Sequence, residues 1–312
     1  MDRNVLDTHA DDDGHKYIEI VNPSPLNGTL YNYFHFLYGL LFPLLLFDAK
    51  ITREFRVTYI FDFNLASMDR IIHSIPLDIK LKQYIANYKA LKVYKCTLKA
   101  MDIGEQPKYK KDLKAIKKNK AQYMTYEMKK IINRWFDSRI SNHNAFTYVK
   151  KYPIIFITRE NDRSYESLSF KDKRYAKRVK THGANRRNIL NNDELIRAVK
   201  DLYTHEDVLT VSFEFVPILH QYILLNNCKL LICQHGAVLG NMAFMKKNSY
   251  VIEIVQRNYI DNGENWFKYF GEEFKLTHKQ LIVESKTNHF FVNPSIFIDF
   301  IKKNIHIELD EN

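Results

Sequence analysis

The sequence predicts an α/β protein whose strands form parallel, doubly wound sheets. In the second half of the chain, apolar runs of strand length alternate with helical patterns, which is typical of βαβ units. The strand candidates are rich in β-branched and aromatic residues. With 312 residues, of which 46% are hydrophobic, the chain is long enough to bury the cores of two domains.

The first half begins with a strand at residues 17–21 that a Pro-rich turn ends. An apolar run of helical length follows at 32–47. Its most apolar part, 34–47, is shorter than the roughly 20 residues that span a bilayer, so we expect a buried helix. The other elements expected here are a strand at 56–63, a short helix at 67–75, a strand at 91–94, and a helical pattern after the basic stretch 108–120 that runs through Phe136.

We place a domain boundary within 142–151, which gives an N-terminal domain of residues 1–148 and a C-terminal domain of residues 149–312. We leave open that the C-terminal helix packs back on the N-terminal domain. The second domain should contain a buried strand at 154–158, a helix at 192–202, a strand at 208–213, a helix at 217–226, a strand at 229–233, a Gly-containing turn with a short helix, and a strand at 250–254. In such sheets ligands bind beyond the carboxyl ends of the strands, here after Ile157, Phe213, Cys233 and Ile254.

The formal net charge of +11 favours polyanionic partners, namely nucleic acid, an anionic membrane or phosphorylated small molecules. The Lys- and Asn-rich composition that an AT-rich genome imposes is the alternative source of this charge. The three cysteines form no disulfide framework or metal pair, so we expect buried thiols and a reducing, cytoplasmic compartment. The N-terminus lacks the residue order of a signal peptide, although a removed targeting segment is left open.

The turn after the strand at 229–233 carries the clearest chemical signal. Small residues let the backbone approach a ligand, and the N–H groups of a helix start attract phosphate oxygens. His235 lies where the strand ends, within reach of such an anion. The alternative is that His235 is an ordinary loop histidine and that the glycines only form the turn. The segment reads Gln234-His235-Gly236-Ala237-Val238-Leu239-Gly240-Asn241.

Together with upstream motifs, this turn resembles glycosyltransferase family 61, whose plant members transfer xylose and arabinose and whose other members transfer N-acetylglucosamine. The resemblance spans about residues 30 to 300. The motifs that carry it are His235-Gly236-Ala237 with Leu239 and Asn241, Val251-Ile252-Glu253-Ile254, Asn32-Tyr33-Phe34-His35, Ile157-Thr158-Arg159, Arg187 to Leu195 with Asn191 inside it, and Gln221. Val238, Gly240 and Asn192 depart from the family pattern, and an N–H of Gly240 would replace a hydroxyl at that position.

The resemblance implies a GT-B-like fold, with two facing Rossmann-like domains and the donor bound by the C-terminal one. It implies that Arg159, Arg187 and His235 meet the diphosphate of a UDP-sugar, and that the pocket is shaped by Gly236, Ala237, Gly240, Asn241 and Asn191. Fixed donors of this kind stabilise the charge that builds on a leaving diphosphate. Surface salt bridges are the alternative for the two arginines. The segment 160–186 is long and basic, either a flap or a solvated insertion.

An inverting transfer needs a base that takes the proton of the acceptor hydroxyl. The candidates in the N-terminal domain are Asp62, Asp69 and His35. Asp69 beside Arg70 is equally a helix-start acid, and His35 is equally a core histidine. We expect no required metal or other cofactor, because Arg and backbone donors serve the diphosphate and the only DxD spacing, Asp11-Asp12-Asp13, lies in the terminal segment.

The sequence thus predicts a glycosyltransferase, inverting and metal-independent, that moves xylose or N-acetylglucosamine from a UDP-sugar to a glycan or glycoprotein. Its composition is also similar to that of glycosyltransferases of large DNA viruses, which act in the host cytoplasm. The alternatives are a basic nucleic-acid-binding protein and a binding scaffold with the same fold but no activity. Against nucleic acid, the basic runs match no RNA-binding signature and the aromatics fall in apolar segments.

Overall fold

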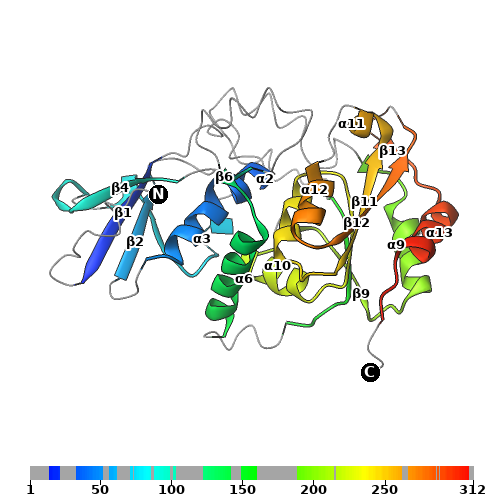
Figure 1. Cartoon of the computed structure of the whole chain (residues 1–312), viewed down its shortest axis with the longest axis horizontal. Coiled ribbons are helices and arrows are strands. Elements are labelled where there is room, and N and C mark those ends of the chain that lie inside the picture. Colours follow the sequence, from blue (N-terminus) through cyan, green and yellow to red (C-terminus); the bar gives the residue numbers. More distant parts are fainter. Residues whose placement is uncertain are drawn as a thin grey trace. The chain divides into compact units, whose positions relative to one another are not determined.

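The chain folds into two compact α/β units in the computed structural model (Figure 1). Unit 1 comprises Met1–Thr147 with Pro217–Leu219, and unit 2 comprises Tyr148–Val216 with His220–Asn312. The structure describes residues 14–21, 33–51, 56–61, 71–72, 74–85, 88–98, 101–102, 122–141, 149–159, 188–213, 216–261, 266–285, 287 and 289–308.

Unit 1 is built on a parallel sheet of four strands in the order β3-β2-β1-β4. Its strands are β1 (His15–Val21), β2 (Arg56–Phe61), β3 (Asp78–Leu81) and β4 (Val93–Thr97). The expected apolar helix is present but irregular: α2 (Tyr33–Phe36) continues through the π-helical segment η2 (Leu37–Leu41) into α3 (Phe42–Asp48). Residues 36–48 are buried, so the expectation of a buried helix is confirmed.

A buried carboxylate joins three elements of unit 1. Asp48, at the end of α3, accepts hydrogen bonds from the Tyr59 hydroxyl at 2.7 Å and from the Trp135 indole N–H at 2.6 Å. The Arg139 guanidinium donates to the same carboxylate at 3.2 Å. Trp135 and Arg139 belong to α6 (Tyr126–Ile140), which Thr125 caps by accepting the Met128 N–H. Asp48 therefore ties α3, β2 and α6 together.

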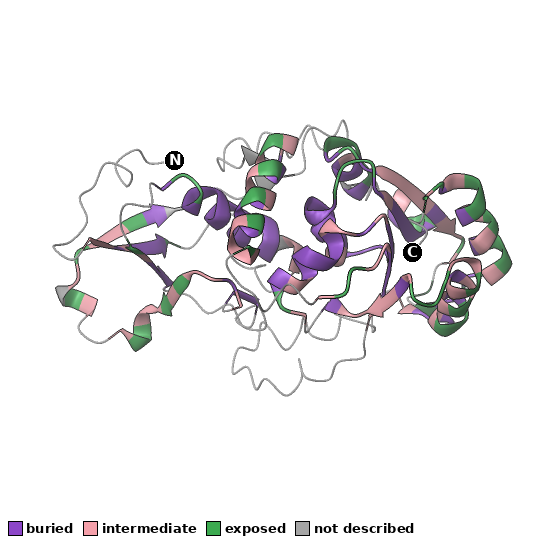
Figure 2. Cartoon of the chain, turned by 90° about the horizontal axis from the view of Figure 1, so that it is seen from below, coloured by how far each residue is buried: buried purple, intermediate pink, exposed green. Residues whose placement is uncertain are grey.

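Unit 2 is built on a parallel sheet of five strands in the order β12-β11-β10-β7-β9. The strands β7, β10 and most of β11 are buried along their length, which Figure 2 shows as purple ribbon. Such continuous apolar runs are expected of parallel strands with both faces covered. The bounds of the strands are β7 (Ile154–Ile157), β9 (Val208–Val211), β10 (Leu230–Gln234), β11 (Tyr250–Gln256) and β12 (Thr277–Val283).

Different helices cover the two faces of this sheet (Figure 1). On one face Phe156 and Ile232 pack in a core with residues of α9 (Asn192–Leu202) and α13 (Pro294–Asn304), such as Leu195. The C-terminal helix α13 thus packs against α9 and β12 of its own unit. The other face is covered by α10 (Ile218–Asn226), the 3-10 helix η10 (Ala237–Phe244) and α12 (Trp266–Glu273).

The predicted class, α/β with parallel sheets, is confirmed, and most predicted elements of unit 2 are present within two residues of their expected ends. Of the expected helix 67–75, the described residues Ile71 and Ile72 are helical. The facing arrangement of a GT-B fold stays a prediction. The sequence did not predict β3, β12 or α11 (Arg257–Asp261). It also did not predict four two-residue strands, which pair as β5 (Met101–Asp102) with β6 (Gln122–Tyr123) and as β13 (His289–Phe290) with β8 (Asn188–Ile189).

Replacing Asp48 by alanine should lower the free energy of unfolding by about 3 kcal/mol, because it leaves buried donors without their acceptor. Urea denaturation of the purified protein measures this. As a control, Glu127→Ala removes an exposed pair with Lys130 and should cost less than about 0.5 kcal/mol. Equal effects of the two substitutions would show that Asp48 does not tie the elements of unit 1 together.

Candidate functional site

The carboxyl edge of the unit 2 sheet has a topological switch point between β7 and β10. After β7 the chain crosses to β9 on one side, and after β10 it crosses to β11 on the other. The two loops therefore diverge and leave the crevice in which doubly wound proteins bind their ligands. The loop after β7 begins with Thr158-Arg159 and the loop after β10 with His235-Gly236, four residues that the sequence motifs had singled out.

Arg159 joins these two loops. Its Nη2 donates to the backbone carbonyl oxygen of His235 at 2.8 Å. The guanidinium lies directly over Gly236, since a Cβ on that residue would be 1.9 Å from Nη2. Gly236 has a φ of +156°, which L side chains rarely adopt. Glycine is thus required here twice, for its backbone conformation and for the close approach of the arginine.

The ring of His235 is buried, with only 3% of the residue exposed. It stacks on Tyr259 at a centroid distance of 5.2 Å and meets Phe267 edge-on at 5.5 Å. Its Nδ1 is hydrogen-bonded to a carboxylate oxygen of Glu253 on β11. The backbone carbonyl oxygen of His235 thus contacts Arg159, and its ring contacts Glu253.

Glu253 is fully buried in the apolar strand β11 and is the centre of a polar cluster. Its second oxygen accepts from Gln280 Nε2 at 2.9 Å and lies 3.1 Å from His278 Nε2. Burial raises the pKa of this carboxyl, but its hydrogen bonds and charge interactions with His235 and His278 outweigh burial and lower the pKa to about 2. Glu253 is therefore ionised inside the sheet, on the face covered by α12.

The sequence motifs included Glu253 but assigned it no role. The signal was present, because a carboxylate within a run of valine and isoleucine must be paired when the strand is buried. Its partners were not visible, since His278 and Gln280 belong to β12, which the sequence pattern did not predict.

Asn241 lies in η10 and is fully buried. Its Nδ2 donates to Gln221 Oε1 at 3.0 Å, and Gln221 Nε2 donates to the carbonyl oxygens of Phe213 at 3.2 Å and Val216 at 2.7 Å. This network connects the segment after β10 with the segment after β9. Ala237 begins η10 and Gly240 is buried within it. Asn241 thus shapes the edge through Gln221, a residue that the sequence motifs had also singled out.

Asn191 precedes α9 and is also buried. Its Nδ2 donates to the Val292 carbonyl at 2.8 Å and to Glu194 Oε2 at 3.1 Å, and its Oδ1 accepts from the Val292 N–H at 3.1 Å. The side chain therefore holds the start of α9 to the segment after β13. A role of Asn191 in shaping the donor pocket stays a prediction.

The remaining predicted residues are not placed in detail. Arg187, Asp62 and Asp69 lie outside the described residues, as does the basic segment 160–186. His35 belongs to α2, and its side chain is not described.

The three cysteines are free and buried, as expected. Burial raises the pKa of the Cys228 thiol to about 12, so it stays protonated.

In the part of the chain that the structure describes, no three His, Cys, Asp or Glu side chains gather as metal ligands would. Nor does any described helix have the length and hydropathy to cross a membrane.

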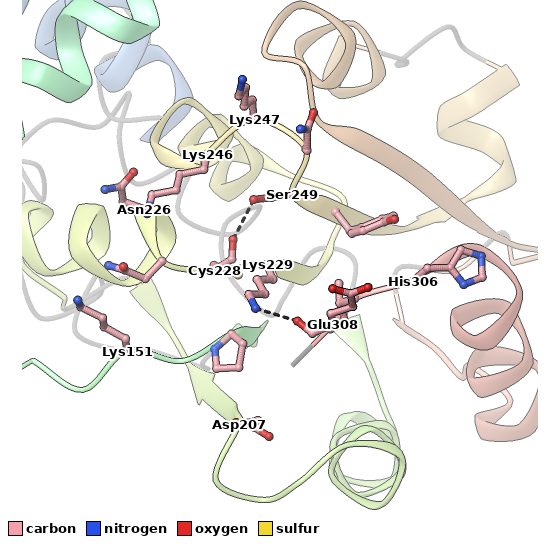
Figure 3. Close-up of a pocket in the computed structure, with 15 residues that line it drawn as sticks. Lys151, Asp207, Asn226, Cys228, Lys229, Lys246, Lys247, Ser249, His306 and Glu308 are labelled. Carbon is pink, nitrogen blue, oxygen red and sulfur yellow. Dashed lines mark hydrogen bonds between the residues drawn. The ribbon is translucent and has the colours of Figure 1, made fainter. Parts of the chain in front are cut away.

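A cavity of about 640 Å³ lies at the opposite, amino edge of the same sheet (Figure 3). It is lined at the starts of the strands by Pro153, Asp207 and Tyr250, and by Lys229, whose Nζ donates to the Glu308 carbonyl at 2.8 Å. Lys151, Lys246 and Lys247 add positive charge around it. The cavity lies at the edge of the sheet opposite to Arg159 and His235, so it is no part of the site described above.

The family model for glycosyltransferase 61 matches residues 33–252, well over half of the chain. The chain belongs to glycosyltransferase family 61. It is accordingly an enzyme of glycosyl transfer, and the family resemblance of its motifs is confirmed. The matched range includes Arg159 and His235.

Curated proteins gave no match. Among solved structures, the chain is similar to the Escherichia coli heptosyltransferase WaaC with ADP, with 10% identity and a TM-score of 0.34 over 92% of this chain and 97% of that one.

The Glu253 cluster predicts how stability responds to acid. A carboxyl whose pKa falls from its ordinary value near 4.5 to about 2 on folding stabilises the fold above pH 4.5. This stabilisation is lost as the pH falls from about 4.5 toward 2. Melting temperatures measured between pH 7 and pH 3 should therefore fall more steeply for the wild type than for Glu253→Gln. Glu284→Gln, which alters an exposed pair with Arg257, should leave the wild-type profile unchanged. Parallel profiles for the wild type and Glu253→Gln would contradict the assignment.

Proposed function

We propose that the enzyme transfers a sugar from a UDP-sugar to a hydroxyl of a glycan or glycoprotein, with inversion and without a required metal. Xylose and N-acetylglucosamine are the favoured sugars, because members of the family use them. The observation that supports a diphosphate-bearing donor is Arg159, held over Gly236 at the switch point of the C-terminal sheet. We also propose a cytoplasmic location, to which the free cysteines are suited.

The chemistry explains why an arginine belongs at this place. The bond between the anomeric carbon of the sugar and the diphosphate oxygen breaks, and the leaving nucleoside diphosphate takes the electron pair. Negative charge therefore grows on the diphosphate in the transition state. A guanidinium fixed beforehand stabilises that charge without reorganising at the moment of reaction. Arg159 is fixed by its bond to the His235 carbonyl and by its packing on Gly236.

His235 and Glu253 hold this geometry. The His235 carbonyl can orient Arg159 only if the residue itself is fixed, and the buried ring is fixed by Glu253 and Tyr259. We propose Glu253 as a positioning residue that acts through His235. Arg187 remains our second candidate for the diphosphate.

Inversion requires the acceptor oxygen to attack the anomeric carbon from the face opposite the leaving group, while a base takes its proton. We propose Asp69 as this base, with Asp62 and His35 as the other candidates. The proposal rests on the sequence position of Asp69 beside Arg70.

Arg159→Ala should reduce kcat/KM at least about 100-fold, because it removes a fixed donor to the leaving group. The assay is release of UDP or GDP from a panel of UDP- and GDP-sugars, run in EDTA. The melting-temperature increase caused by UDP should also be lost. Arg134→Ala, which alters an exposed arginine bonded within α6, should retain full activity. A fully active Arg159→Ala protein would exclude the proposed diphosphate site, and activity that needs added metal would exclude metal independence.

Asp69→Asn should bind UDP with unchanged affinity and lose transfer, since the amide cannot take the acceptor proton. Calorimetric titration with UDP and the transfer assay measure the two effects separately. If Asp69→Asn transfers sugar at the wild-type rate, the base is another residue, and Asp62→Asn and His35→Gln are then compared in the same way. NMR of the product linkage tests inversion.

A further inference from the structure

Three polar side chains at the carboxyl edge of unit 2 contain buried atoms that lack a hydrogen-bond partner among the described residues. They are the Thr210 hydroxyl on β9, the Ser212 hydroxyl just beyond it, and the Nε2 of Gln234 at the end of β10. Gln234 is only 5% exposed. Buried polar groups are nearly always hydrogen-bonded, so three such atoms at one edge require an explanation.

These side chains project from the same face of the sheet. Thr210 is paired in register with Phe156, and Phe156 with Ile232, both of which face the core formed with α9 and α13. Because side chains alternate along a strand, Gln234, two residues after Ile232 in β10, faces the same way, and Ser212 follows Thr210 by two residues just past the end of β9. Gln234 is also paired with Ile254 of that core. The polar atoms thus lie where this core reaches the carboxyl edge.

Their position relative to Arg159 is defined by the same register. β7 lies between β9 and β10, and Arg159 follows the end of β7. Ile157, the last residue of β7, is paired with Cys233 in the row that contains Glu253, and Arg159 follows two residues later, where its guanidinium bonds the His235 carbonyl. The Glu253 cluster thus lies on one face of the sheet and the neutral polar atoms on the other, and Arg159 follows the strand between β9 and β10.

We propose that Gln234, Thr210 and Ser212 bind the nucleoside of the sugar donor. This inference rests on the proposed function and adds to it which residues bind the uncharged part of the leaving group. An amide and two hydroxyls offer neutral donors and acceptors, which suit the ribose hydroxyls and the edge of a base, whereas a diphosphate requires charge. The sugar has to remain open to the acceptor, so buried groups suit the nucleoside better. Since the three atoms are shielded from solvent, binding includes a local opening of this edge.

Titrating UDP and inorganic pyrophosphate into the protein separates binding of the nucleoside from binding of the diphosphate. Gln234→Leu should raise the Kd for UDP about tenfold, because the nucleoside loses hydrogen bonds, and should leave the Kd for pyrophosphate unchanged. Thr210→Val and Ser212→Ala should act in the same direction. Arg159→Ala should instead weaken both ligands.

Thermal melting without ligand distinguishes a binding role from a structural one. Removing polar atoms that lack partners should leave the melting temperature of the free protein equal or higher. Gln256→Leu is the matched control, because Gln256 is a buried glutamine at the end of β11 whose Nε2 donates to the Thr287 carbonyl at 2.6 Å. That substitution should lower the melting temperature and leave the Kd for UDP unchanged.

The outcomes are distinct. If the wild type binds neither UDP nor pyrophosphate, the proposed function itself is wrong. If the wild type binds UDP and the Gln234, Thr210 and Ser212 variants bind it equally well, the nucleoside inference is overturned while the diphosphate site stands. Parallel loss of UDP and pyrophosphate in these variants would also overturn it, since their role would then be structural.

Discussion

The site depends on the pairing of one buried carboxylate. Glu253 lies in the middle of an apolar parallel sheet, where an isolated charge costs several kcal/mol. Its hydrogen bonds to His235 and Gln280 and its proximity to His278 compensate that cost. Because the carboxylate requires these partners, the ring of His235 has a fixed place. The fixed backbone of His235 in turn presents its carbonyl oxygen to Arg159.

These contacts link the interior of unit 2 to the carboxyl edge of its sheet. Glu253 has no bond to Arg159, yet the two contact opposite ends of the same histidine. The arginine then lies against Gly236, where only a residue without Cβ leaves room. Two adjacent residues thus provide three features: His235 provides a buried ring and a carbonyl acceptor, and Gly236 provides the space for a guanidinium.

The edge as a whole separates charge from neutral polarity. The Glu253 cluster belongs to one face of the sheet, and the atoms of Thr210, Ser212 and Gln234 that lack a hydrogen-bond partner to the other, with Arg159 at the carboxyl end of the strand between β9 and β10. A nucleoside diphosphate has the same division, with charge on the phosphates and neutral hydrogen-bonding groups on the ribose and base. The match between the two patterns is the physical basis of both proposals.

The sequence alone determined the class of the fold and predicted the place of the candidate site. Alternating strand and helix patterns require parallel strands, and parallel strands bring the turns after Ile157 and Cys233 to one edge, because their carboxyl ends coincide. Only the tertiary structure decided which atoms meet. Strand order and register decide that Arg159 contacts the His235 carbonyl and that the His235 ring contacts Glu253. They also decide that Asn191 is hydrogen-bonded to Val292. Periodicity along one segment carries no information about its neighbours in the sheet, so β12 and its contribution to the buried cluster were found only in the folded chain.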